Sequence, residues 1–274
     1  GLEAYSAAVP FKPSSADNSW TYLNVALRRT EGHWEVLDYG VESGVATVVP
    51  DPSEGIRIEL IEEENYTGVV MLIEDPARVF LGTSTDGDFS PDIPGKRISE
   101  MFDRYPNALG AVNAGAFYDD GTDSRAVGSY PLGLTVSDGV APKSPGSNLT
   151  PGMEGFAGFD SKNKLVVLDY NLTPEEATAL DIRDGVSAGP ALIIDMEVQP
   201  AADEHSGYAP RTAIGQTSDG TVILLCINGR VFNSLGATYA DLINIMVEYG
   251  AVNACNLDGG ASSTMMYRDT YGRY

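Results

Sequence analysis

Three segments of this chain of 274 residues share a design that could do chemistry. In each, an apolar strand-like run ends on a polar side chain that enters a glycine-containing turn, and the polar residues are Asn113, Asn228 and Asp258. Loops that follow strand ends are where rigid scaffolds present functional groups. Glycine there lets the backbone approach a ligand closely and aim its N–H groups at an anion. The pattern indicates an anion-binding site, although each turn taken alone also fits an ordinary tight turn.

The segment that begins at Asp258 is the richest of the three in polar groups. One carboxylate is followed by glycine N–H groups and by hydroxyls, from Gly259, Gly260, Ser262, Ser263 and Thr264. A carboxylate can act as a nucleophile or a base, and the donors around it can hold the oxygens of a phosphate. The bland alternative is a turn in which Asp258 caps its own backbone.

Arg211 lies in the segment Pro210–Gly215, directly before an apolar strand. Arginine is suited to bidentate phosphate binding because its guanidinium presents a planar fork of N–H groups. In so acidic a chain, however, an arginine is equally suited to a structural ion pair. The spacing alone leaves both interpretations open.

The charge of the chain excludes one broad class of function. Lys and Arg number 17 and Asp and Glu number 39, so the net charge is −22. This field repels nucleic acid and anionic lipid, and we therefore expect no nucleic-acid partner. A local basic cluster can still bind one phosphate, since charges are screened beyond about 8–10 Å.

The cysteine content and the lack of long apolar runs bear on location. No run reaches about 18 apolar residues, so we expect no membrane span. Cys226 and Cys255 are too few for a disulfide scaffold, and we expect two buried small side chains, with one bridge as the alternative. Together with the acidic charge, this favours an extracellular or cell-surface bacterial protein whose leader or anchor has been removed.

One acidic segment is a candidate metal site. Asp119, Asp120 and Asp123 offer oxygen ligands for a divalent cation such as calcium. Their spacing does not match the EF-hand pattern, and a solvated turn is the alternative. We expect no obligatory cofactor.

The elements that position these residues follow from periodicity. Pro50-Asp-Pro52 marks a boundary between an N-terminal lead with short strands, residues 1–50, and a main domain, residues 51–274. Residues 1–19 are polar and interrupted by prolines, and we expect them to be poorly ordered. In the main domain, strand-type runs occupy residues 56–61, 68–73, 109–112, 133–136, 165–168, 191–194, 221–227 and 251–257.

Helical patterns are few in the main domain. Apolar residues have helical spacing over 98–105 and 238–249, and Thr173 begins a further short helix. Many short strands with two or three helices predict an α+β fold, with mixed, largely antiparallel sheets and a few packed helices.

Taken in order, the motifs of the main domain resemble those of the phosphodiester glycosidase family. The resemblance covers roughly residues 56–268 and is carried by Ala111–Phe117, Pro131–Gly133, Asp138-Gly139, Ser187–Ile193, Pro210–Gly215, Asn228–Arg230, Ser234–Gly236 and Asn253–Met265. It implies a phosphodiester-glycosidase-like fold. It also implies a hydrolase that cleaves a sugar-1-phosphodiester, such as a GlcNAc-phosphodiester, at the anomeric C–O bond.

The resemblance makes Asp258, Arg211 and Asn113 the principal catalytic candidates. It implies that Asp258 serves the anomeric centre as nucleophile or base and that Arg211 binds the phosphate. A phosphate monoester leaves as a stabilised anion and needs little help from a general acid. We also expect Asn113 to contact the sugar. The substrate-binding candidates are Asn228, Arg230, Gly259, Gly260, Ser262, Ser263 and Thr264.

Four positions depart from the usual residues of the family, Ala116 and the three that bear on catalysis: Ala114, Asn228 and Ala261. They leave open a non-catalytic module that binds a phospho-glycan or cell-wall polymer through the same groups. A third alternative is a metal-dependent phosphodiesterase that uses the acidic segment at 119–123 and cleaves on the phosphorus side. In every case we expect a small phosphorylated carbohydrate or glycan as ligand, in exopolysaccharide or other carbohydrate metabolism.

Overall fold

The computed structural model describes residues 3–11, 21–30, 33–43, 53–85, 89–90, 93–118, 130–141, 154–200 and 207–268. For the ranges up to residue 43 it describes the backbone alone. The chain divides into two compact units, Gly1–Asp51 and Pro52–Tyr274, and each is described by itself.

The first unit contains a three-stranded antiparallel sheet in the order β1-β2-β3. Its strands are β1 (Glu3–Phe11), β2 (Thr21–Thr30) and β3 (His33–Ser43). For residues 3–11, β1 corrects the expectation of a poorly ordered lead, and the rest of residues 1–19 lies outside the described residues. Apolar residues stand at alternate positions from Tyr5 to Phe11, and Pro10 is tolerated because β1 is an edge strand.

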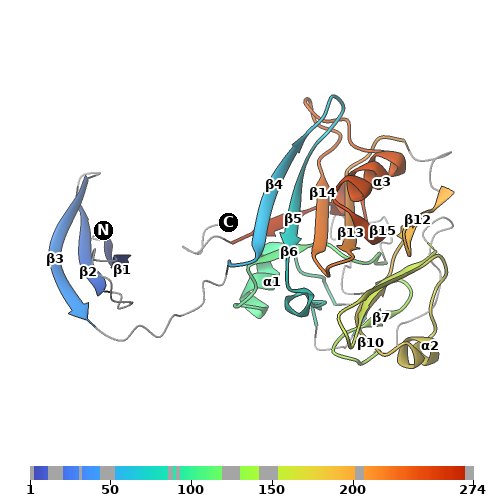
Figure 1. Cartoon of the computed structure of the whole chain (residues 1–274), viewed down its shortest axis with the longest axis horizontal. Helices are drawn as coiled ribbons and strands as arrows, with labels where there is room; N and C mark the ends of the chain where they lie inside the picture. The colour runs from blue at the N-terminus through green and yellow to red at the C-terminus, as the bar shows by residue number, and fades with distance from the viewer. Residues whose placement is uncertain are drawn as a thin grey trace. The chain divides into compact units, whose positions relative to one another are not determined.

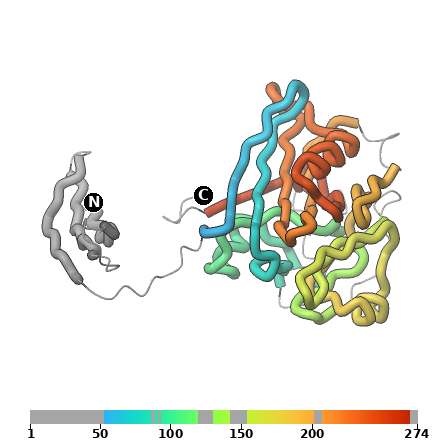
Figure 2. Tube along the Cα trace, viewed as in Figure 1, coloured from blue at the N-terminus to red at the C-terminus, as the bar shows by residue number. Residues whose placement is uncertain are grey.

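A seven-stranded sheet forms the centre of the second unit, in the order β12-β11-β15-β13-β14-β5-β4 (Figure 1). The strands are β4 (Ile56–Glu62), β5 (Thr67–Ile73), β11 (Ala191–Ile194), β12 (Glu197–Val198), β13 (Arg211–Thr217), β14 (Val222–Ile227) and β15 (Ala251–Asn256). β5 pairs with β14, so segments far apart in the sequence lie side by side, as the trace in Figure 2 shows.

Two smaller sheets and three α-helices complete the described part of this unit. A four-stranded sheet has the order β7-β10-β8-β9, and β16 pairs with β6. These strands are β6 (Gly110–Val112), β7 (Thr135–Val136), β8 (Phe156–Asp160), β9 (Leu165–Leu168), β10 (Ile182–Ser187) and β16 (Met265–Tyr267). The helices are α1 (Ile98–Arg104), α2 (Pro174–Ala179) and α3 (Tyr239–Glu248), with short 3-10 turns η1 (Pro76–Arg78) and η3 (Gly260–Ser262).

The core of this unit is layered, and β14 shows both sides of it. Ile223 and Leu225 pack in one apolar cluster with Leu242 of α3. Val222 and Leu224 pack in another with residues of the four-stranded sheet. Because successive side chains of a strand point to opposite faces, α3 covers one face of the seven-stranded sheet and the four-stranded sheet covers the other. α2 closes the far side of that second sheet.

The start of α3 is fixed by its first-turn residues. The hydroxyl of Thr238 accepts a hydrogen bond from the N–H of Asp241 at 3.2 Å, and the Asp241 carboxylate accepts one from the N–H of Thr238 at 2.8 Å. This capping box satisfies N–H groups that the helix itself cannot. Beyond the other end Gly250 has φ +75°, a conformation that favours glycine. Tyr239 is thereby held at the first position of the helix, where it contacts Arg211.

The α+β fold predicted from the sequence is confirmed. Each strand pair in the described residues is antiparallel, and three α-helices occur there, close to the predicted positions. Five strands were not predicted: β1, β8, β10, β12 and β16. Within the described ranges, no helix combines the length and the apolar character needed to span a bilayer.

Candidate functional site

The candidate residues gather at one end of the seven-stranded sheet. β13 begins at Arg211, which pairs directly with Ile227, the last residue of β14. β15 ends at Asn256, which pairs with Ala213. Because neighbouring strands are antiparallel, the start of β13 and the ends of β14 and β15 lie at the same end of the sheet. The turns that follow Ile227 and Asn256 therefore emerge close to Arg211.

Two backbone hydrogen bonds set Asp258 opposite Arg211. The N–H of Leu257 donates to the carbonyl of the residue after Arg211 at 2.8 Å, and the N–H of Gly260 donates to the carbonyl of the residue before it at 2.9 Å. Between these two hydrogen bonds the Asp258 segment has two residues and the Arg211 segment has one. An extra residue of this kind is a bulge, which changes the direction of the side chains beside it. A Cβ placed on Gly259 would lie 3.9 Å from the Cδ atom of Arg211. The carboxylate turn and the arginine thus belong to one local structure.

The carboxylate of Asp258 is partly buried. Burial raises the pKa of Asp258 above its ordinary value of 3.8, and hydrogen bonds from the Ser262 hydroxyl and the Gly259 N–H oppose that rise in pKa without cancelling it. The Gly259 N–H donates to Oδ1 at 3.0 Å. A carboxylate with reduced solvation and two directed donors suits a nucleophile or a base at an adjacent carbon.

Asn113 ties three segments together just after β6. Its Nδ2 donates to the backbone carbonyl of Asp258 at 2.6 Å. Its Oδ1 accepts from the hydroxyl of Thr212 at 2.7 Å and from the N–H of Thr264 at 3.0 Å. These bonds occupy both acceptor directions of the amide oxygen and one of its two N–H groups. The side chain therefore positions the Asp258 turn, and one N–H is left for the predicted sugar contact.

Thr212 is a site residue that the sequence analysis did not single out. It is fully buried, and its hydroxyl fixes Asn113 from the strand that also carries Arg211. Its position directly after Arg211 was the only available signal, because nothing in the sequence links residue 212 to residue 113.

The guanidinium of Arg211 is held on three sides. Nε donates to the carbonyl of Ala237 at 3.2 Å, and Nη2 donates to the carbonyl of Gly207 at 3.1 Å. The carbon Cζ lies 4.1 Å from the centroid of the Tyr239 ring, a cation–π contact. None of these described contacts is with a carboxylate, so the described residues give no support to a structural ion pair. Two of five N–H groups are used in these bonds, which orients the remaining fork.

Arg230 approaches the same turn from the loop after β14. A Cβ placed on Gly260 would lie 3.9 Å from its Nη1. Arg230 has φ +58°, a left-handed conformation that is uncommon for residues other than glycine. Asn228 is exposed, and its Nδ2 donates to the hydroxyl of Thr67 at 3.1 Å. The loop thus brings a second guanidinium to the carboxylate turn.

The three hydroxyls after Asp258 have different surroundings. Ser262 bonds to the carboxylate of Asp258. The Oγ of Ser263 is buried and has no hydrogen-bond partner among the described residues. Thr264 is exposed, and its N–H contacts Asn113. Of the three, Ser262 is therefore the one coupled directly to the acid.

Asp119, Asp120 and Asp123 fall outside the described residues, and the described residues contain no group of acids, histidines or cysteines that could hold a metal ion. Cys226 and Cys255 are buried and form no disulfide, which confirms the expectation of two buried small side chains over the alternative of one bridge. Burial raises the pKa of the Cys226 thiol to about 11 and that of Cys255 to about 12, so both stay protonated at neutral pH.

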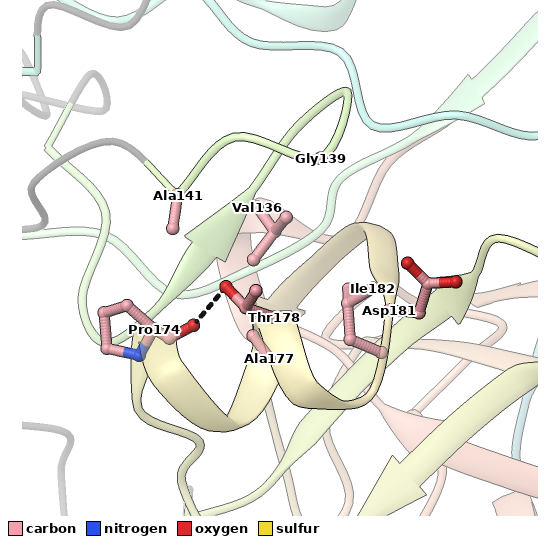
Figure 3. Close-up of a pocket in the computed structure, with 8 residues that line it drawn as sticks. All are labelled: Val136, Gly139, Ala141, Pro174, Ala177, Thr178, Asp181 and Ile182. Carbon is pink, nitrogen blue, oxygen red and sulfur yellow. Dashed lines mark hydrogen bonds between the residues drawn. The ribbon is translucent and has the colours of Figure 1, made fainter.

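A pocket of about 110 Å³ lies between α2 and the turn after β7 (Figure 3). Its lining consists of Val136, Gly139, Ala141, Pro174, Ala177, Thr178, Asp181 and Ile182. The Thr178 hydroxyl donates to the carbonyl of Pro174 at 2.9 Å, so it serves the helix. The pocket contains none of the candidate residues and a single carboxylate, which gives it no clear chemistry.

The family model for phosphodiester glycosidase matches residues 106–274, the part of the chain that holds Asn113, Arg211 and Asp258. The chain belongs to the phosphodiester glycosidase family. Four of the segments that carried the resemblance in the sequence contribute to the end of the sheet described above: Ala111–Phe117, Pro210–Gly215, Asn228–Arg230 and Asn253–Met265.

The chain is also similar in sequence to a longer bacterial protein. The SPbeta prophage-derived uncharacterized protein YomE of Bacillus subtilis is 29% identical over 237 residues, which is 85% of this chain. The chain spans only 34% of that protein's length.

Two solved structures share the fold. The catalytic domain of zebrafish N-acetylglucosamine-1-phosphodiester α-N-acetylglucosaminidase, auto-inhibited by its pro-peptide, has a TM-score of 0.55 and 17% identity. The match covers 97% of this chain and 78% of that one. A hypothetical protein from Synechocystis has a TM-score of 0.56 and 16% identity, with coverage of 96% and 72%. At these identities, the likeness concerns the phosphodiester glycosidase fold.

Proposed function

We propose that this protein is a hydrolase that cleaves a sugar-1-phosphodiester, of the GlcNAc-phosphodiester class, at the anomeric C–O bond. The observation that supports the proposal is that backbone hydrogen bonds join the turn of Asp258 to the start of β13, where Arg211 lies, and that a Cβ on Gly259 would lie 3.9 Å from the Cδ atom of Arg211. Family membership supports the reaction type, and the name of the zebrafish structure supports the sugar.

The chemistry follows from these two groups. In one route Asp258 attacks the anomeric carbon while the C–O bond to the phosphate breaks, and water then displaces Asp258 from the sugar. In the other route Asp258 takes a proton from the water that attacks the anomeric carbon as that C–O bond breaks. The leaving group is a phosphate monoester that keeps both bonding electrons, and Arg211 and Arg230 stabilise its charge. A leaving group of this acidity needs no general acid, so one carboxylate suffices where common glycosidases use a spaced pair.

The overall negative charge of the chain makes Arg211 and Arg230 important for attracting an anionic ligand. With a net charge of −22, an anionic ligand is repelled from most of the surface. Two guanidinium groups beside one turn therefore supply local attraction within the screening length of about 8–10 Å. The composition and the relationship to a prophage-derived protein also support a bacterial setting and an exported enzyme of carbohydrate metabolism.

The test is incubation of the purified chain with the methyl diester of GlcNAc-1-phosphate in heavy-oxygen water. Cleavage at the anomeric C–O bond releases GlcNAc and methyl phosphate, with the heavy oxygen on the sugar. Cleavage on the phosphorus side instead places the heavy oxygen in the phosphate, and a metal-dependent reaction also stops in chelator. Binding of the diester without any product contradicts hydrolysis and indicates a binding module.

A further inference from the structure

An apolar hairpin tip follows Arg230 directly. The backbones of Val231 and Ser234 pair with each other, with N–H to carbonyl distances of 3.0 and 3.1 Å. Phe232 is fully exposed at the turn, and Val231 and Leu235 are each about half exposed. We name Val231, Phe232 and Leu235 the apolar tip.

The apolar tip stands on a firmly bonded base. The Ser234 hydroxyl donates to the carbonyl of Asn228 at 2.7 Å and accepts from the N–H of Thr67 at 3.1 Å. The N–H of Leu235 donates to the carbonyl of Asn65 at 2.7 Å. A Cβ on Gly236 would lie 2.4 Å from the backbone of Ala209, so the chains touch there. These contacts hold the hairpin in place, and none of them buries the Phe232 ring.

The apolar tip flanks the proposed phosphate site. Phe232 is two residues from Arg230, so their Cα atoms are within about 7.6 Å, and Arg230 itself reaches Gly260. On the other side, Tyr208 is about half exposed and follows Gly207, whose carbonyl holds Arg211. Exposed apolar residues are therefore close along the chain to both arginine contacts: Phe232 to Arg230, and Tyr208 to the Gly207 carbonyl that Arg211 binds.

We propose, resting on the proposed function, that the apolar tip binds the alcohol portion of the phosphodiester and that this alcohol is a hydrocarbon or aromatic one. A ligand bound there has an anionic group on the arginines and an apolar group on Phe232. Val231 and Leu235 are aliphatic and suit a hydrocarbon better than a sugar, whose hydroxyls need nearby polar partners. Apolar contact also supplies affinity that the acidic field of the chain does not oppose.

The test uses the phosphate product, so that its result does not depend on turnover. The dissociation constants of octyl phosphate and methyl phosphate are measured by calorimetric titration for the wild type, for Phe232→Ala and for the control Val198→Ala. Val198 is an apolar residue of edge strand β12 that is about half exposed, as Val231 is. We expect octyl phosphate to bind roughly tenfold more tightly than methyl phosphate, about 1.4 kcal/mol, in the wild type and in the control. In Phe232→Ala this preference disappears while the affinity for methyl phosphate stays.

Three outcomes overturn the inference. Equal affinity of the wild type for the two phosphates is one, and a preference that persists in Phe232→Ala is another. The third is sedimentation of the wild type, but not of Phe232→Ala, with phosphatidylcholine vesicles, which assigns the apolar tip to a lipid surface. If the product titration succeeds while no diester is hydrolysed, the subsite stands and the proposed hydrolysis fails.

Discussion

The amide of Asn113 donates to the backbone carbonyl of Asp258 at 2.6 Å, across a sequence separation of 145 residues. The same side chain accepts from Thr212 and Thr264, so it joins the segment after β6 to β13 and to the carboxylate turn. An asparagine in this position sets where the carboxylate points, and its removal should disturb chemistry and stability together.

Asn113→Ala is expected to lower the free energy of unfolding by about 2–4 kcal/mol, because it leaves the Thr212 hydroxyl and backbone groups at Asp258 and Thr264 without their partner. It should lower kcat by roughly 100-fold, about 2.7 kcal/mol, with a smaller change in KM. Denaturant unfolding and steady-state kinetics measure both. The control is Asn228→Ala, an exposed asparagine with one described side-chain bond, which should cost under about 1 kcal/mol. Equal losses of unfolding free energy in both variants would contradict the positioning role of Asn113.

Arg211→Lys should lower kcat/KM for a GlcNAc-phosphodiester by roughly 10–100-fold, because a lysine cannot bind two backbone carbonyls and still present a planar fork to a phosphate. An uncharged aryl glycoside of GlcNAc should be affected much less. The matched control is Arg57→Lys, since Arg57 lies on edge strand β4 and its one ion pair among the described residues is a long, exposed contact of 3.9 Å with Glu59. Equal losses for charged and uncharged substrates argue against a phosphate role for Arg211.

Ser262→Ala should move the acid limb of the kcat/KM profile to higher pH. The Ser262 hydroxyl stabilises the ionised carboxylate and lowers the pKa of Asp258, so its loss lets the effect of burial raise that pKa further. Ser263→Ala is the neighbouring control, because its Oγ has no partner among the described residues. A profile that moves to lower pH, or one that moves equally in both variants, would show that the acid limb is not that of Asp258.

Asp258→Asn should make the fold more stable at neutral pH than the wild type. The pKa of Asp258 is raised in the folded state, so the folded state holds this proton more tightly than the unfolded state does. Wild-type stability therefore decreases as pH rises from the unfolded pKa, near 3.8, through the raised folded pKa, and asparagine removes this decrease. Denaturant unfolding across this range should show a difference that grows with pH and then levels. A difference that shrinks with rising pH is the opposite result.

Local patterns predicted most of the second unit. The apolar run from residue 68 to 73 predicted β5, because a strand buried on both faces has a continuous apolar sequence. The helical spacing after Thr238 predicted α3, because the residues of its capping box are neighbours in the sequence. β8 and β10 escaped notice because their glycines break the apolar pattern. Gly158 and Gly185 face each other so closely that a Cβ on either would lie 2.8 Å from the Cα of the other. Glycine is thus required at each position by the closeness of the partner strand, which the local sequence does not reveal.

The site was predictable in its residue types but not in its contacts. Asp258, Arg211 and Arg230 could be chosen from motif order, yet the part of Asn113 depends on Thr212 and Thr264, which meet it only in the fold. Tyr239 likewise reads as the first residue of a helix, and its contact with Arg211 follows from how α3 packs on the sheet. β1 was missed for a simpler reason, since the prolines and polar residues around it outweighed its alternating pattern.

The proposed reaction depends on the carboxylate of Asp258, and turnover by Asp258→Asn tests this dependence most directly. The substitution keeps the size of the side chain and removes its charge. Release of GlcNAc from the phosphodiester should fall by at least roughly 1000-fold, about 4.1 kcal/mol, while the thermal unfolding midpoint at neutral pH is equal to that of the wild type or higher. Hydrolysis at the wild-type rate by this folded variant would contradict the role assigned to Asp258 and, with it, the proposed mechanism.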